Sequence, residues 1–251
     1  MPESPEVLNY YLYINPILQG ERIKESKILS GKYLTKKEIP NIEKVKDLKI
    51  VDIVLKGKTI FVKCEKNISI VFVHGMTGYY STEKEKHSRL VLYLENAELY
   101  YNDPRNFGTV TVYTTEDEYS KAFDKLGPDI LNDDITYEEF YSRIDKKPRL
   151  EIGSVLLDQN LICGIGNYLR CDILWYCKIN HRRKIGSLTE EEKKTLYNAS
   201  VNIIRYHAEM SYDLEYEPEE EFFAYMQSED IFGNDVLTEK YKGRTIHYVE
   251  W

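Results

Sequence analysis

The chain contains 251 residues, of which 42% are apolar and 30% are charged, and its formal net charge is −8. A chain of this size and apolar content can bury a sizeable core, and its 13 glycines and 8 prolines are too few for a collagen-like or low-complexity protein. No apolar run approaches the roughly 18 residues of a membrane span, and the opening MPESPEVLNY lacks the basic-then-apolar order of a secretion signal. We therefore expect a globular intracellular protein with no membrane partner, nuclear in a eukaryote and in the cytoplasm or nucleoid otherwise.

The first half of the chain predicts a helix followed by a sheet. Apolar residues recur at helical spacing from Pro5 to Leu18, which indicates a helix that Pro16 should end or kink. From about Lys49 to Val112, short alternating runs are separated by turn residues, a pattern typical of a sandwich or barrel. The clearest predicted strands are residues 50–55, 60–63, 68–73 and 90–94.

The second half predicts helices and a terminal hairpin. A break at Leu126-Gly127-Pro128 separates it from the strands. Thr136 opens a sequence typical of a capping box, and three glutamates follow Thr189, where negative charge suits a helix start. Helices are therefore expected to begin near Thr136, Gly153, Asn167 and Thr189, and strands to cover residues 222–227 and 245–249.

Together these patterns predict an α+β fold in three parts. Residues 1–125 are expected to form a β-sandwich domain with the first helix, and residues 126–216 a helical domain. Residues 217–251 are expected to form a β-hairpin. We find no internal repeat, so the parts are expected to have distinct roles.

The cysteines and the overall charge narrow the classes of ligand. Cys64, Cys163, Cys171 and Cys177 are scattered without a close pair, so we expect reduced thiols and no metal site. The acidic balance argues against a long electrostatic contact with nucleic acid, but it allows a small one.

The first residues place an amine beside a carboxyl group. Removal of Met1 would leave Pro2 with a free α-amine, whose pKa in a model peptide is about 7.7–8.0. An amine that attacks the C1′ atom of a sugar forms a cationic iminium, which withdraws electrons from the C2′ protons. Glu3 is placed to protonate the ring oxygen or to shuttle protons. Many proteins begin with Met-Pro, so this pair gains weight only from the motifs that follow.

Several further motifs follow in order along the chain. They are Gly57-Lys58 between two predicted strands, HGMTG at 74–78, DPRNFG at 103–108, LLDQ at 156–159 and GIGNYLR at 164–170. With them the chain resembles, nearly end to end, the Fpg/Nei family of base-excision DNA glycosylases (formamidopyrimidine-DNA glycosylase and endonuclease VIII). The resemblance implies a β-sandwich domain, a helix-two-turn-helix domain and damaged DNA as the partner.

The resemblance implies catalytic roles for three residues. Pro2 would be the Schiff-base nucleophile, and Glu3 would be the acid that assists ring opening. Lys58 would hold a phosphate and help to eject the base.

The resemblance also implies DNA contacts. Met76, Arg105 and Phe107 would fill the space left by a flipped-out nucleotide, because extruding a base costs a few kcal/mol that a wedge and a cation partly recover. His87 would contact a phosphate. Asn167 would begin a helix whose outward-pointing N–H groups suit another phosphate.

The C-terminal region departs from most of the family. Most members end in a four-cysteine zinc finger, whereas no cysteine follows Cys177 here. Residues 225–234 and Gly243-Arg244-Thr245 nevertheless keep the hairpin outline and resemble the zincless finger of some members. Arg244 would then contact a phosphate and support catalysis, and neither a metal nor a cofactor would be required.

We therefore predict a bifunctional DNA glycosylase and abasic-site lyase that cuts by β- and δ-elimination. Gly153 stands where bacterial Fpg enzymes have a lysine, and residues 168–170 with 173–175 resemble the endonuclease VIII branch, whereas the trio of Met76, Arg105 and Phe107 resembles the other branch. This mixture favours oxidised pyrimidines and ring-opened purines over 8-oxoguanine. A monomer acting on damaged double-stranded DNA, and on single-stranded or bubble DNA, is expected. The alternative is a non-catalytic damaged-DNA binding protein, for which Pro2, Glu3 and Lys58 would have no use.

Overall fold

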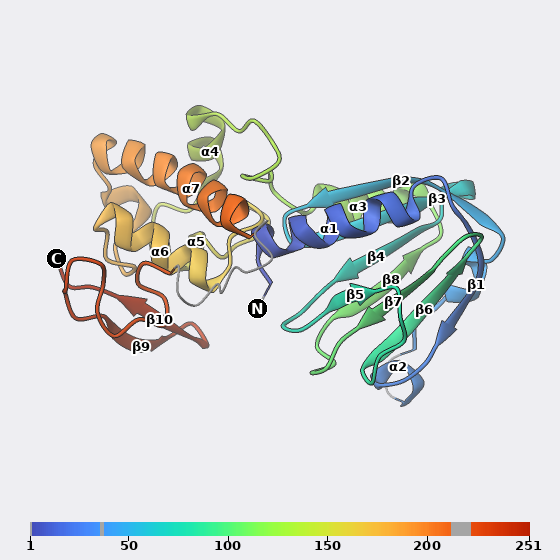
Figure 1. Cartoon of the computed structure of the whole chain (residues 1–251). Helices are drawn as coiled ribbons and strands as arrows, with labels where there is room; N and C mark the ends of the chain where they lie inside the picture. The colour runs from blue at the N-terminus through green and yellow to red at the C-terminus, as the bar shows by residue number, and fades with distance from the viewer. Residues whose placement is uncertain (1, 36–37, 212–221) are drawn as a thin grey trace. The chain divides into compact units, whose positions relative to one another are not determined.

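The computed structural model describes residues 2–35, 38–211 and 222–251, and these form two compact units (Figure 1). One unit comprises Pro2 and Glu6–Lys125, and the other contains Glu3–Pro5 together with the described residues from Leu126 to Trp251. The three-part division expected from the sequence remains a prediction, and its boundary between residues 216 and 217 lies outside the described residues.

The first unit packs a helix against an antiparallel sheet. Helix α1 (Ser4–Leu18) continues two residues beyond Pro16 and buries Val7, Ile14 and Leu18 in the core of the sheet. The strand order is β5-β7-β6-β1-β2-β3-β4-β8 (Figure 1). The strands are β1 (Arg22–Ile28), β2 (Leu48–Lys56), β3 (Thr59–Cys64), β4 (Ser69–Val73), β5 (Tyr79–Ser81), β6 (Ser88–Leu94), β7 (Glu98–Asn102) and β8 (Thr109–Tyr113).

The alternating runs of the sequence form strands because their apolar side chains fill the core of this unit. β3 is buried on both faces: Ile60 and Val62 lie in the main cluster, and Phe61 is covered by Tyr119 and Phe123 from α3. The predicted strands at 50–55, 60–63, 68–73 and 90–94 are thereby confirmed. The shorter helical segments of this unit are α2 (Lys32–Thr35), η1 (Ile42–Val45), η2 (Glu65–Asn67) and α3 (Glu116–Asp124).

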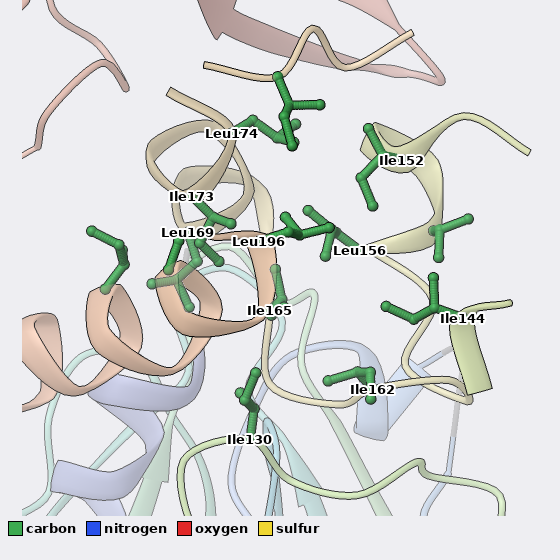
Figure 2. Packing of buried hydrophobic residues seen from close by; sticks show 14 of the residues in the cluster. Ile130, Ile144, Ile152, Leu156, Ile162, Ile165, Leu169, Ile173, Leu174 and Leu196 are labelled. Carbon is green, nitrogen blue, oxygen red and sulfur yellow. The ribbon is translucent and has the colours of Figure 1, made fainter. Parts of the chain in front are cut away.

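The second unit has its own core of helices. Side chains from α4, α5, α6 and α7 meet in one apolar cluster, in which Leu169 and Ile173 of α6 pack with Leu196 of α7 (Figure 2). Thr189 caps α7 through a complete capping box with Glu192, as its sequence predicts. The helical segments are α4 (Tyr137–Ile144), α5 (Ile152–Val155), α6 (Asn167–Cys177), η3 (Ile185–Ser187) and α7 (Glu190–Met210).

The chain ends in a hairpin of β9 (Leu237–Tyr241) and β10 (Arg244–Tyr248). Lys242 and Gly243 both have positive φ values (49° and 79°), the conformation that a two-residue hairpin turn requires. Tyr241 and Ile246 belong to the helical core. The hairpin is therefore packed onto the helices by apolar contact.

The strand predicted over residues 222–227 is wrong. Three of its backbone N–H groups bond to side chains: Ala224 and Tyr225 donate to the buried Asp172 carboxylate, and Met226 donates to His247 Nδ1. Gln227 N donates to Ala224 O, which makes a turn rather than a strand pair. The alternation of apolar residues in this segment reflects packing against α6 and α7, not strand pairing.

Two further findings concern ligands and membranes. Within the described part of the chain, no group of three or more His, Cys, Asp or Glu side chains could hold a metal ion, and the four cysteines are free thiols. None of the helices that the structure describes combines the length and the apolarity needed to cross a bilayer.

Candidate active site and DNA-contact residues

The carboxylate of Glu3 occupies the N-terminal end of α6. Glu3 is 1% exposed; its Oε2 accepts hydrogen bonds from Gly166 N (2.7 Å) and Leu169 N (3.2 Å), and its Oε1 accepts one from Tyr168 N (2.9 Å). These donors are the N–H groups that a helix leaves unpaired at its start, where the helix dipole favours negative charge. A Cβ atom on Gly166 would lie 2.1 Å from Glu3 Cδ, so only glycine leaves room for the carboxylate.

The same helix start carries Asn167, whose contact with a phosphate stays a prediction. The N–H groups expected to face a phosphate at this helix start are engaged by Glu3. The Asn167 side chain is also engaged, because its Nδ2 donates to Thr245 O at 2.8 Å and its Oδ1 accepts from Arg170 Nη2 at 2.5 Å. Asn167 therefore ties the start of α6 to β10 of the hairpin.

Arg170 lies fully buried beneath Asn167. Besides contacting Asn167, it donates from Nη1 to Gly153 O at 3.0 Å, and its guanidinium lies 5.5 Å from the centre of the Tyr241 ring. Burial lowers the pKa of Arg170. Gly153 is packed against His181, where a Cβ atom would lie 2.8 Å from His181 Cβ. From the sequence, Arg170 was noted only as part of GIGNYLR and was given no role.

Arg244 lies at the exposed start of β10, opposite Tyr241 in the hairpin. Its neighbour Thr245 accepts the hydrogen bond from Asn167. Tyr225 also belongs to this group: burial raises its pKa, and a hydrogen bond with Asn167 opposes that rise. Within the second unit, Asn167 therefore contacts both Tyr225 and Thr245, the residue next to Arg244.

The first unit holds the other candidate residues. Lys58 is half-buried at the turn between β2 and β3, where Gly57 has a φ of 57°. Met76 and Phe107 are 37% and 55% exposed, and the Arg105 guanidinium lies 4.9 Å from the centre of the Phe107 ring. Large apolar side chains left in solvent are the form that a wedge requires.

The loops that carry Met76 and Phe107 touch each other. A Cβ atom on Gly75 would lie 2.6 Å from the carbonyl carbon of Phe107. His87 is half-buried in the β5–β6 connection, and its carbonyl oxygen accepts a hydrogen bond from Asp103 N (3.1 Å), at the start of the Phe107 loop. The structure therefore places the Met76, Arg105 and Phe107 loops together, with the His87 backbone behind them.

A buried histidine precedes Met76. His74 Nε2 lies 3.1 Å from Tyr80 Oη, and the ring packs against Tyr10 and Tyr101. Burial lowers the pKa of His74 to about 3, so the ring is neutral at physiological pH. From the sequence, this histidine was noted only as part of a motif, and its place before a glycine at a strand end was the available signal.

Matches with known proteins cover most of the chain. Residues 1–110 match the model of the formamidopyrimidine-DNA glycosylase N-terminal domain, and residues 126–213 match that of the formamidopyrimidine-DNA glycosylase H2TH domain. A formamidopyrimidine-DNA glycosylase of Ligilactobacillus salivarius is 31% identical over 212 residues, 82% of this chain and 75% of that protein. One from Desulfitobacterium hafniense is 32% identical over 211 residues, 81% of this chain and 77% of that protein.

Solved structures show the same fold. The MutM (Fpg) protein of Thermus thermophilus matches with a TM-score of 0.85 and 25% identity, over 98% of this chain and 97% of that one. Lactococcus lactis Fpg, in a complex with DNA that contains an abasic site, matches with a TM-score of 0.84 and 22% identity, over 99% and 98%. The α+β architecture expected from the sequence is therefore confirmed.

Proposed function

The chain belongs to the formamidopyrimidine-DNA glycosylase family, and we propose that it is a DNA-repair glycosylase that also cleaves the strand through an imine on Pro2. One observation carries the proposal. The residue that follows Pro2 in the chain is a fully buried carboxylate whose two oxygens accept three backbone N–H groups. Burying an acidic side chain is costly without such partners, and these partners hold the carboxylate directly next to the residue that we propose as the nucleophile.

The proposed chemistry begins with the glycosylase step. The Pro2 nitrogen attacks C1′, the bond from C1′ to the base breaks, and the base leaves with that electron pair as an anion that takes a proton from water. Glu3, held as a carboxylate, accepts the proton that the Pro2 amine loses and passes it to the ring oxygen O4′ as the C1′–O4′ bond opens. The product is a cationic iminium between Pro2 and C1′.

The iminium then supports strand cleavage. It withdraws electrons from C2′, so a C2′ proton is lost and the 3′-phosphate leaves in β-elimination. A second elimination releases the 5′-phosphate, and hydrolysis of the imine frees Pro2. Lys58 is proposed to hold a phosphate beside this chemistry, and Arg244, with Asn167 as its neighbour, to hold another.

The remaining residues are proposed to bind the damaged duplex. Met76 and Phe107 fill the gap left by the flipped nucleotide, and Arg105 faces the orphaned base. Oxidised pyrimidines and ring-opened purines are the proposed substrates. Gly153 leaves no side chain at the family's lysine position, and its carbonyl oxygen accepts from Arg170.

Borohydride trapping tests the proposal. Protein whose N-terminal Pro2 has been verified by mass spectrometry is incubated with duplex DNA that carries one abasic site or one oxidised pyrimidine. We expect a covalent complex with both substrates. Pro2→Ala, which keeps an α-amine, should still trap, whereas protein with a blocked α-amine should not.

The opposite result favours the alternative. Damage-specific binding in a mobility-shift assay, with no trapping of unblocked protein on either DNA, would overturn the lyase and favour a non-catalytic damaged-DNA binding protein. Trapping that persists after the α-amine is blocked would show that the imine forms on a lysine instead. Lys58→Ala would then test whether that lysine is Lys58.

A further inference from the structure

Two loops of the first unit are joined by one buried carboxylate. The loop of residues 74–78 connects β4 to β5 and carries Met76, and the loop of residues 103–108 connects β7 to β8 and carries Arg105 and Phe107. We infer that Asp103 is a positioning residue that, through Thr77, sets Met76 relative to Arg105 and Phe107 before DNA binds. The inference rests on the proposed function, because it concerns the three side chains proposed to replace the flipped base.

The two oxygens of Asp103 bond to different loops. Asp103 is fully buried; its Oδ1 accepts from Thr77 Oγ1 at 2.7 Å, and its Oδ2 accepts from Gly108 N at 2.7 Å. Thr77 Oγ1 in turn accepts from Arg105 N at 3.0 Å. One carboxylate and one hydroxyl therefore form a continuous hydrogen-bonded path from the Met76 loop to the backbone on both sides of Phe107.

The side chains of Arg89 and Lys32 donate hydrogen bonds to carbonyl groups of the 103–108 loop. Arg89 donates to Asp103 O (2.8 Å) and to Pro104 O (3.2 Å), and Lys32 donates to Asn106 O (3.0 Å). These hydrogen bonds to its carbonyl groups fix the backbone of the loop. The Arg105 and Phe107 side chains remain exposed to solvent.

Missing side chains let the two loops approach closely. A Cβ atom on Gly75 would lie 2.6 Å from Gly108 N, and one on Gly78 would lie 2.5 Å from Tyr101 Oη. A Cβ atom on Gly108 would lie 1.9 Å from the same hydroxyl. The two loops therefore contact each other and Tyr101 so closely that one loop has little room to shift relative to the other.

A trio fixed in advance has a functional consequence. The cost of ordering a loop opposes binding when the order is gained only in the complex. Here Asp103 and Thr77 supply the order within the free protein. Their hydrogen bonds should therefore matter for reactions in which a paired base must be extruded, and little where no gap has to be filled.

The test compares Thr77→Val, which keeps the shape and removes the hydroxyl, with Thr77→Ser, which keeps the hydroxyl. Thr82→Val, at an exposed threonine outside both loops, is the matched control. On a duplex with one oxidised pyrimidine, Thr77→Val should lower kcat/KM by roughly tenfold, the loss expected for about 1.4 kcal/mol of hydrogen bonding. On a single-stranded abasic site, the change should stay within about twofold, and Thr77→Ser should restore the duplex rate.

Hydrogen exchange in the free protein provides a readout that does not depend on activity. The amides of Arg105 and Gly108 should exchange faster in Thr77→Val and in Asp103→Asn, whose amide cannot accept on both sides. An equal loss on both DNA substrates, or unchanged exchange at these amides, would overturn the positioning role.

The two proposals can fail separately. If the wild-type protein forms no imine, the proposed function fails. Affinity for an abasic duplex relative to single-stranded DNA then replaces turnover as the readout for Thr77→Val. A ratio of affinities equal to that of the wild type would overturn the inference, and a lower ratio would support it.

Discussion

At Gly166, the absence of a side chain leaves room for the Glu3 carboxylate, which we propose to act in catalysis. Its φ and ψ of −121° and −152° are open to any residue, so its value lies in the space that it leaves for Glu3. Gly166→Ala should push the carboxylate out of the start of α6. Because displacing a catalytic group by about 1 Å can cost about 100-fold, we expect a loss of that size in single-turnover base excision.

The control for this prediction is a double variant. Glu3→Gln should lose a comparable rate, and adding Gly166→Ala to it should change little further, because both act on one group. Full activity in Gly166→Ala would show that the position of the carboxylate does not limit the reaction.

Met226 illustrates the opposite case, in which a side chain sits where glycine fits better. It has a φ of 61°, and its side chain is 56% exposed. The left-handed conformation costs roughly 1–2 kcal/mol for a residue with a Cβ atom, of which the greater freedom of unfolded glycine cancels part. Met226→Gly should therefore stabilise the protein by about 0.5–1 kcal/mol, measured by urea denaturation. Destabilisation would show that the methionine side chain packs productively.

At the scale of elements, the loop of residues 230–234, which precedes β9, is held by hydrogen bonds to the Asp230 carboxylate. This carboxylate accepts from Trp175 Nε1 (2.9 Å), Phe232 N (2.9 Å) and Asn234 N (2.9 Å). The Trp175 ring is stacked between Phe223 and Phe232. The loop is attached to α6 through Trp175, and the hairpin is attached to α6 through the hydrogen bond from Asn167 to Thr245.

The pKa of Asp230 makes this loop sensitive to acid. Burial raises the pKa, but the hydrogen bonds from Asn234, Trp175 and Phe232 outweigh it and lower the value from 3.8 to about 2. A lowered folded-state pKa contributes stability that is complete above about pH 4 and lost as the pH falls towards 2. The wild type should therefore lose stability over that window, and Asp230→Asn should lose less over it.

The same variant has an expected effect at neutral pH. An asparagine cannot replace all the hydrogen bonds that the carboxylate accepts, so we expect Asp230→Asn to melt roughly 2–6 °C lower at pH 7. A melting temperature equal to that of the wild type at pH 7 would show that the loop does not contribute to global stability.

The elements differ in how far the sequence predicted them. β3, β4 and β6 are apolar and buried along most of their length, β2 begins with alternating buried and exposed residues, and α7 has a capping box. The sequence pattern and the local chemistry therefore agreed with the fold at these elements. β1 was missed because it buries little more than Ile23. α3 was missed although Thr115 caps it and three acidic residues follow, the signal that we used for α7.

The site was predictable only in part. Motif order singled out Glu3, Lys58, Met76 and Phe107 as candidates, but it gave no indication that Glu3 would occupy the start of α6. That contact joins residues 163 positions apart, and only the folded backbone determines which N–H groups are available. Residues 222–227 failed for a similar reason, because their partners are the distant side chains of Asp172 and His247.

At the scale of the whole molecule, the net charge of −8 limits the electrostatic contact with DNA. If two or three cationic side chains, including Lys58 and Arg244, neutralise phosphates, the logarithm of the affinity should fall with the logarithm of salt concentration with a slope of about −2 to −3. Arg244→Ala should make that slope shallower by about 1. Mobility-shift titrations on an abasic duplex provide the measurement, and a slope steeper than about −6 would contradict a small footprint.

The hydrogen bonds between Glu3 and α6 also set an order of events during synthesis. A ribosome adds roughly 5–20 residues per second, so α6 emerges about 10–40 s or more after the amino end. Until then Glu3 has no helix to enter, and the chain beside it stays open to the aminopeptidase that would remove Met1. The amine that we propose as the nucleophile is thus exposed while translation still runs, and its carboxyl neighbour is bound only after about a third of the second unit has been made.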